Sequence, residues 1–165
     1  MNQLFFVLII IAFICFFKYI EYATKNKRTA LVYKKRDYLM TKAELEFFRV
    51  LESIIKNQYY IIPQLSISKI AAVTKGKNYH TYLNKIDRKT VDFVLFDKEY
   101  FSPIMVIELD DSSHNSENRR MRDDFVDNVM EKIGLKIIHI KTAYTYNEEE
   151  LANLIFRIKN NNTEE

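Results

Sequence analysis

Three acidic residues stand where two apolar segments of this chain should not need them. Asp92 lies inside the run VDFVL at residues 91–95, and Glu108 and Asp110 close the run VIELD at residues 106–110. Burying a carboxylate without a partner costs several kcal/mol. Hard divalent cations take carboxylate oxygens, so a metal ion is the simplest partner. The pattern predicts metal-dependent chemistry on phosphodiesters.

The spacing of these acids favours convergence on one site. Glu108 and Asp110 are two residues apart, so in a strand both side chains leave the same face. If the two segments are neighbouring strands, Asp92 can approach that face, and a cation is then needed to offset the repulsion. Mg²⁺ held by Asp92 and Glu108 would activate a bound water and neutralise a scissile phosphate. Alternatively, Glu108 and Asp110 merely end an exposed strand and begin a polar loop.

Other polar residues near this cluster have more than one interpretation. His114 follows in a polar loop, where it is a general base, a phosphate contact or a plain surface histidine. Arg119, Arg122 and Asp124 lie on the next segment, which is either a solvated face of alternating charge or a phosphate-binding helix in which Asp124 holds an arginine or His114. His139 is expected to be structural.

Periodicity and end signals define the elements that position these residues. Thr41 and Glu44 form a capping box, and Gly134 is a suitable helix C-cap. The predicted elements are helix 41–57, strands 61–70, 91–96 and 103–109, helix 118–133, strand 135–140 and helix 147–159. Strands 91–96 and 103–109 are expected to form an antiparallel hairpin, and helix 118–133 a parallel crossover. The fold class is therefore α/β, with a mixed sheet and flanking helices.

The sequence also makes predictions for residues 74–89 and for strand 135–140. Residues 74–89 are polar, basic and rich in tyrosine, and form either a solvated connection or a nucleic-acid contact, as a long loop or a short helical excursion. Strand 135–140 (LKIIHI) is expected to be buried on both faces or nearly so.

The N-terminus predicts a membrane anchor. Residues 4–17 are uninterruptedly apolar, and counting to Ile20 gives roughly 17 residues or about 25 Å of helix. A cleaved signal peptide is the alternative, but its charged start and small-residue cleavage site are lacking. Positive charges follow the run, which places the C-terminal part in the cytoplasm. The expected organisation is anchor 1–20, basic juxtamembrane linker 21–40, one domain 41–160 and a disordered tail 161–165.

Composition sets the outer bounds. The chain has 165 residues, 48% hydrophobic, with two Gly and two Pro. This length and hydrophobicity fit one folded domain, and the scarcity of turn residues disfavours an all-β sandwich. A net charge of +3 permits nucleic-acid binding without arguing for it. The single cysteine, Cys15, excludes an internal disulfide or a cysteine zinc site.

The acidic strand end, the spacing of Ser112 and His114 and the Arg-x-x-Asp helix come together in residues 108–138, preceded by residues 89–97 and 41–51. This combination resembles the bacterial domain of unknown function 2726 (DUF2726) over roughly residues 35–157. That family is similar to the restriction-endonuclease-like PD-(D/E)XK superfamily, within it to the very-short-patch-repair-like group. The resemblance implies a mixed four-stranded sheet flanked by helices.

The resemblance also assigns roles. Asp92 matches the motif aspartate, Glu108 the second metal-binding acid, and Glu44 the acid that many members carry on the first helix. Asp110 occupies the position of the usual lysine, which His114, Arg122 or Lys132 would have to replace. Two functions follow: an Mg²⁺-dependent nuclease anchored in a membrane, or an inactive module that tethers nucleic acid or a protein there.

Overall fold

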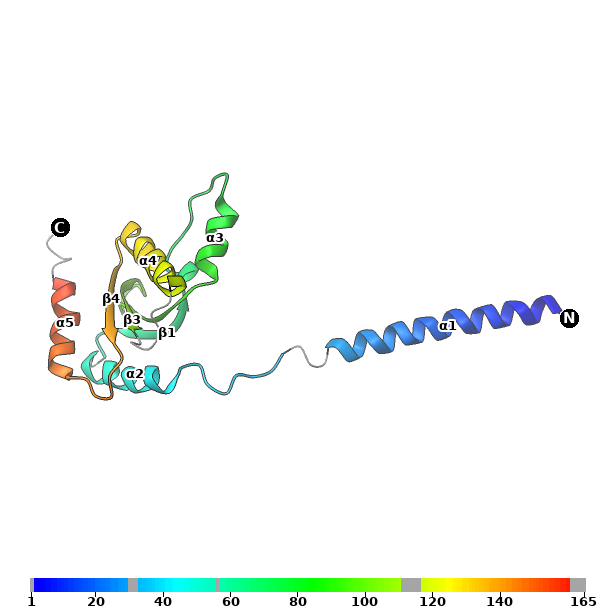
Figure 1. Ribbon diagram of the computed structural model, residues 1–165, viewed down its shortest axis with the longest axis horizontal. Coiled ribbons are helices and arrows are strands. Elements are labelled where there is room, and N and C mark those ends of the chain that lie inside the picture. Colours follow the sequence, from blue (N-terminus) through cyan, green and yellow to red (C-terminus); the bar gives the residue numbers. More distant parts are fainter. Residues whose placement is uncertain (1, 30–32, 56, 111–116, 161–165) are drawn as a thin grey trace. The chain divides into compact units, whose positions relative to one another are not determined.

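A computed structural model describes residues 2–29, 33–55, 57–110 and 117–160 of the chain. It divides the protein into two compact units, Met1–Tyr38 and Leu39–Glu165. The first unit is built on one long helix, and the second holds the sheet with its covering helices (Figure 1).

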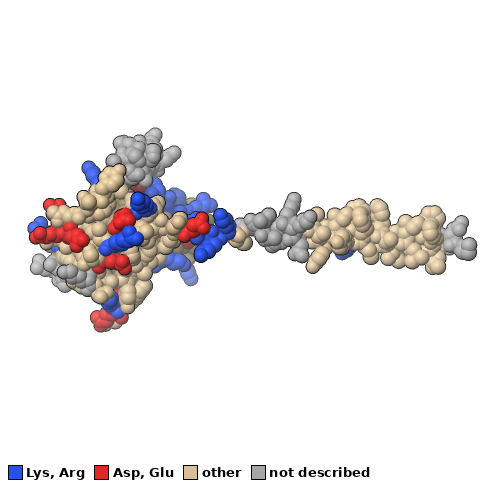
Figure 2. Space-filling model, turned by 90° about the horizontal axis from the view of Figure 1, so that it is seen from below, with Lys and Arg blue, Asp and Glu red and all other residues tan. Residues whose placement is uncertain are grey.

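The first unit consists mainly of helix α1, Asn2–Thr29. Its stretch Gln3–Thr24 has a mean hydropathy of 2.4 and is long and apolar enough to cross a membrane. In the part of this helix whose side chains are described, residues 3–24, the charged side chains are Lys18 and Glu21, and most of the surface is uncharged (Figure 2). Helix α1 continues past Ile20 into the segment predicted as linker, where Thr24 Oγ1 donates to the Ile20 carbonyl at 2.9 Å. Residues 33–41 form neither helix nor strand.

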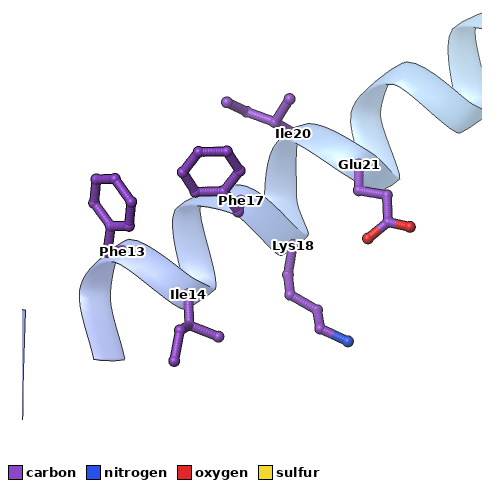
Figure 3. A pocket seen from close by; sticks show the side chains of 6 residues that line it. All are labelled: Phe13, Ile14, Phe17, Lys18, Ile20 and Glu21. Carbon is purple, nitrogen blue, oxygen red and sulfur yellow. The ribbon is translucent and has the colours of Figure 1, made fainter. Parts of the chain in front are cut away.

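A shallow hollow on α1 is lined only by side chains of this helix, which Figure 3 displays. Phe13, Phe17 and Ile20 project to one side of the helix, and Ile14, Lys18 and Glu21 project to the other. The hollow is therefore a groove between side chains of one helix.

The second unit is organised around a four-stranded sheet in the order β1-β2-β3-β4. The strands are β1 (Tyr60–Ser66), β2 (Thr90–Phe96), β3 (Pro103–Asp110) and β4 (Lys136–Lys141). Strand β2 is antiparallel to both β1 and β3, and β3 is parallel to β4. Helix α4 (Glu117–Lys132) connects the parallel pair. The mixed sheet, the hairpin and the crossover are thus confirmed.

Helices cover both faces of the sheet. One face carries α2 (Lys42–Ile55) and α5 (Glu148–Asn160), and its core includes Phe47, Phe93, Ile107 and Ile155. The other face carries α3 (Tyr79–Asp87) and α4, and its core includes Ile86, Val94, Val106, Val126 and Met130. The alternation of side chains along β2 and β3 feeds both cores, which explains why these central strands are almost wholly apolar.

The helix ends follow the predicted signals. In the capping box, Glu44 N–H donates to Thr41 Oγ1 at 3.3 Å and Thr41 N–H donates to Glu44 Oε2 at 2.6 Å. Gly134 has a φ of 70°, and its N–H donates to the Glu131 carbonyl while Leu135 N–H donates to that of Met130. These two bonds form the Schellman arrangement that ends α4.

The predicted strand 61–70 stops at Ser66 and is followed by a 3-10 turn, Ile67–Lys69. The reason lies in α3. Ser66 Oγ donates to the Asp87 carbonyl at 3.1 Å, and Ser68 Oγ donates to Asp87 Oδ1 at 2.7 Å. These bonds turn the chain away from the sheet. Segment 74–89 accordingly contains α3, so the helical alternative for this segment is the one observed.

The expectation that strand 135–140 is buried on both faces is wrong. Strand β4 lies at the edge of the sheet, and of its six residues only Ile138 is buried. Lys136, His139 and Lys141 are exposed. An edge strand has a neighbour on one side only, so helices cover it incompletely, and charged residues along it also discourage edge-to-edge association.

Candidate acidic site at the end of the central strands

Asp92 lies where both backbone ladders of β2 are interrupted. The pairing of β1 with β2 skips Gln64 and Asp92, and the pairing of β2 with β3 ends at Phe93 and Ile107. Beyond that pair, the backbone N–H of Leu109 donates to Asp92 Oδ2 at 2.8 Å. A side-chain carboxylate therefore takes a strand donor at this end of the hairpin.

Gln64 connects Asp92 to the first helix of the unit. Its Nε2 donates to Asp92 Oδ1 at 3.4 Å and to Glu44 Oε1 at 3.1 Å. Its φ is 52°, in the left-handed region. Glu44, which the family resemblance matches to an acid on the first helix, is thus linked to Asp92 through the side-chain amide of Gln64.

Glu108 is buried, with 8% of its surface exposed. Burial raises the pKa of Glu108 to about 8, and the charge of Asp92 and a hydrogen bond with its carboxylate act in the same direction. The charge of Arg122 opposes this rise, whereas that of Asp123 adds to it. At neutral pH, Glu108 therefore retains a proton that it shares with Asp92.

Asp110 belongs to a second group of side chains on the neighbouring edge strand. His139 Nδ1 lies 3.2 Å from Asp110 Oδ1, and its Nε2 lies 3.0 Å from Asp127 Oδ1 on α4. Burial alone lowers the pKa of His139, but the hydrogen bonds to Asp127 and Asp110 and their charges outweigh it, so the pKa is raised above 6.5. His139 is next to Glu108 in the strand register.

The remaining predicted residues are less closely gathered. Arg122 Nη2 donates to the Thr90 carbonyl at 3.1 Å, and Arg122 Nη1 lies 3.8 Å from Asp123 Oδ1. Asp124 is exposed on α4. Arg119 lies in the first turn of α4.

His114 and Lys132 were predicted as possible replacements for the usual lysine, and the structure supports neither of them. His114 lies outside the described residues. Lys132 is exposed in the last turn of α4, ten residues after Arg122, or about 15 Å along the helix. Three residues were predicted to replace the usual lysine. Of these, in the described part of the chain, Arg122 is the one whose charge acts on Glu108.

Asp92 and Glu108 are the two carboxyl groups through which this site could hold a metal ion. In the described residues, no three His, Cys, Asp or Glu side chains form a group that could hold one. Mg²⁺ is commonly bound by one or two carboxylates, with water and substrate phosphate completing its shell. Asp92 and Glu108 offer two carboxyl groups at one point, which is a donor set of the kind that Mg²⁺ takes once Glu108 has lost its proton.

Sequence reasoning missed two contributors. Gln64 is the one polar residue inside the otherwise apolar stretch YIIPQL, which is a usable signal for a buried polar contact. Asp127 sits among several charged residues of α4, and nothing in that pattern distinguishes it from its neighbours. His139 was expected to be structural, and its two hydrogen bonds to Asp110 and Asp127 were not foreseen.

Comparison with known proteins gives one result. No curated protein and no solved structure matches this chain. A family model described as a protein of unknown function, DUF2726, matches residues 36–158, which include every described residue of the candidate site. The chain therefore belongs to the DUF2726 family.

Proposed function

We propose that this protein is a membrane-anchored, metal-dependent nuclease-like domain that hydrolyses phosphodiester bonds of nucleic acid. The observation that carries the proposal is the buried pair of Asp92 and Glu108, in which the pKa of Glu108 is raised to about 8. Perturbed carboxyl groups that meet at the ends of two strands are frequent at catalytic sites, since folding alone gives no reason to place them together.

The chemistry of the pair follows from its charge. Asp92 and Glu108 would hold Mg²⁺, which supplies a water of lowered pKa and neutralises charge on a scissile phosphate. Leu109 N–H and the Gln64 amide fix the orientation of Asp92. The arrangement of an aspartate on β2, a glutamate on β3 and a helical crossover to β4 supports the likeness to the PD-(D/E)XK superfamily.

A basic surface around α3 supports nucleic acid as the substrate. Helix α3 packs on the same face of the sheet as Val106, two residues before Glu108. Lys75, Lys77, Lys85 and Arg88 are exposed on α3 and its flanks. Tyr82 is also exposed, with Lys85 Nζ 5.6 Å from its ring centre. Cations bind backbone phosphates and aromatic rings stack on bases, so this surface can hold a nucleic-acid strand on the face of the sheet that α3 covers.

Helix α1 supports the membrane part of the proposal. Its apolar stretch Gln3–Thr24 matches the thickness of a bilayer, and lysine and arginine residues follow it in the sequence. The protein would then be a single-pass membrane protein with its C-terminal unit in the cytoplasm, where nucleic acid is accessible.

A second function is favoured by one specific observation. Asp110 occupies the position where the superfamily carries lysine, and its carboxylate is engaged with His139. A non-catalytic module that tethers nucleic acid or a protein at the membrane has no need of that lysine. Such a module also has no need of a metal between Asp92 and Glu108.

Calorimetric titration of Mg²⁺ and Mn²⁺ into the full chain in detergent micelles tests the proposal. We expect binding in the wild type, its loss in an Asp92→Ala/Glu108→Ala variant, and its retention in Glu131→Ala, which removes an exposed acid of α4. Turnover of labelled DNA and RNA then separates the two functions. Glu108→Ala should abolish cleavage by an enzyme but leave nucleic-acid binding by a tether intact or strengthened. Absence of metal binding in the wild type, with and without nucleic acid, would exclude the metal-dependent function.

A further inference from the structure

We propose that Gln64 is a positioning residue that orients the Asp92 carboxylate for the cation of this site. The inference rests on the proposed function and adds to it a residue that lies outside the acidic motif. It is carried by the geometry of one side-chain amide placed between two carboxylates.

The backbone of Gln64 is unusual for its place. Asn57, Gln64 and Phe101 are the described residues other than glycine with positive φ, and of these only Gln64 lies within a strand. A side chain with a Cβ is sterically disfavoured at a φ of 52°. Backbone strain of this kind persists where the surrounding structure requires it, and it concentrates at functional sites.

The contacts of Gln64 explain what the strain achieves. Its amide has two N–H groups, and Nε2 meets Glu44 Oε1 at 3.1 Å and Asp92 Oδ1 at 3.4 Å. Glu44 is itself fixed by Thr41 N–H, and Asp92 Oδ2 by Leu109 N–H. The chain of bonds from the α2 cap to β3 thereby sets the rotation of the Asp92 carboxylate relative to Glu108.

The identity of the residue is chemically specific. A glutamate at position 64 would bring a further negative charge between Glu44 and Asp92, and a leucine would leave both carboxylates without this donor. An amide is neutral and donates two hydrogen bonds, so it can join two acids without competing for their cation.

A purely structural role, in which Gln64 only ties α2 to the sheet, makes a different prediction from positioning. Gln64→Gly separates the two roles because glycine adopts positive φ at no steric cost while the amide is lost. If Gln64 positions Asp92, the Kd for Mg²⁺ should rise about 10–100-fold, as for other residues that orient metal ligands. The thermal midpoint should stay close to that of the wild type, since relief of strain offsets the lost bonds.

Three further variants complete the experiment, all in the full chain in detergent micelles. Gln64→Asn tolerates positive φ but is one methylene too short to bridge the acids, so the same rise in Kd is expected. Gln64→Leu removes the amide but, unlike glycine, does not increase the freedom of the backbone. It therefore serves as the test if the glycine variant unfolds at too low a temperature. Asn57→Gly relaxes another residue of positive φ, 66°, in the connection between α2 and β1, and should leave the Kd unchanged.

The outcomes are distinguishable. Wild-type affinity for Mg²⁺ in the Gly, Asn and Leu variants would overturn the positioning role and leave the proposed function standing. A lower thermal midpoint with unchanged Kd would identify Gln64 as a structural tie and also overturn it. Failure of the wild type itself to bind Mg²⁺, with or without nucleic acid, would remove the proposed function and this inference together.

Discussion

The carboxyl group of Glu108 is hydrogen-bonded to the carboxylate of Asp92 across the splayed ends of β2 and β3, and the pKa of Glu108 is about 8. The two acids therefore hold one proton between them at neutral pH. Without a metal ion, ionisation of the pair lowers the free energy of unfolding. With a metal ion, the pair would bind it at a defined point. Both consequences can be measured.

Replacing Glu108 by glutamine should stabilise the metal-free protein at high pH. Because the folded-state pKa of about 8 exceeds the ordinary value of 4.5, the stability that the protonated group contributes is present below pH 4.5 and is lost as pH rises towards 8. The loss amounts to at most about 1.4 kcal/mol per pH unit. Glutamine mimics the protonated acid at every pH.

Thermal unfolding with EDTA at pH 4, 6 and 8 checks this. The advantage of Glu108→Gln over the wild type should grow with pH and be near zero at pH 4. The matched variant Glu131→Gln removes an exposed acid of α4 and should show no such trend. An advantage that is the same at all three pH values would contradict the raised pKa of Glu108.

Magnesium affinity should depend on pH for the same reason. The ion has to displace the proton of Glu108, so at pH 6–8 the affinity is expected to rise about tenfold per pH unit and to level off above a pH of about 8. Calorimetry at pH 7 in two buffers of different ionisation enthalpy should report release of about one proton per ion. Binding that is independent of pH over this range would place the ion elsewhere.

His139 should contribute to the free energy of unfolding with a pH dependence of the same sign as that of Glu108. Its pKa is raised by Asp127 and Asp110, so its contribution is fully present below pH 6.5 and is lost as pH rises through the higher folded-state value. His139→Asn should destabilise the protein at pH 5.5 more than at pH 8.5. In an Asp127→Asn background, that pH dependence should shrink, because one of the two acids that hold the imidazolium is neutral. Chemical denaturation at both pH values measures these differences.

The sequence specified most of the fold because its signals are local. The capping box at Thr41, the stop at Gly134 and the apolar alternation of the central strands each depend on a few neighbouring residues. Burial of strand 135–140 was wrongly predicted because an apolar run cannot reveal whether a strand lies inside or at the edge of the sheet.

The site was only partly predictable for a different reason. Asp92 and Glu108 could be paired from strand order and spacing alone. The role of Gln64 depends on a φ value and on contacts 20 and 28 residues away in sequence. Likewise, the contact of Asp110 with His139 spans 29 residues and requires β3 and β4 to be neighbours. Such long-range contacts have no local signature.

The basic surface around α3 should govern the electrostatic part of nucleic-acid binding. Each lost phosphate contact lowers the slope of log K against log salt by about 0.9 for duplex DNA. The double variant Lys85→Gln/Arg88→Gln should therefore reduce the slope by nearly two, with weaker binding to all sequences. Lys132→Gln, at the end of α4, serves as the control, with an unchanged slope. Equal slopes for both variants would place the nucleic acid on another surface.

Helix α1 should hold the protein in the bilayer uncleaved. Ile10→Arg places a charge near the middle of the apolar stretch Gln3–Thr24, at a cost of about 2.5–3.5 kcal/mol for insertion. This variant should shift from the carbonate-resistant membrane fraction to the soluble fraction, whereas Ile20→Arg, near the end of the stretch, should remain inserted because arginine can reach the interface.

Intact mass and thiol labelling distinguish anchor from signal peptide. The wild-type protein should retain its N-terminal residues in the membrane, whereas a mature chain lacking α1 would identify a cleaved signal. Tyr144→Cys introduces a thiol at a fully exposed position of the folded unit, and Cys15 is the sole native cysteine, within the apolar stretch. A membrane-impermeant reagent should label Tyr144→Cys only in opened cells. Labelling in intact cells would place the folded unit outside the cytoplasm, away from nucleic acid.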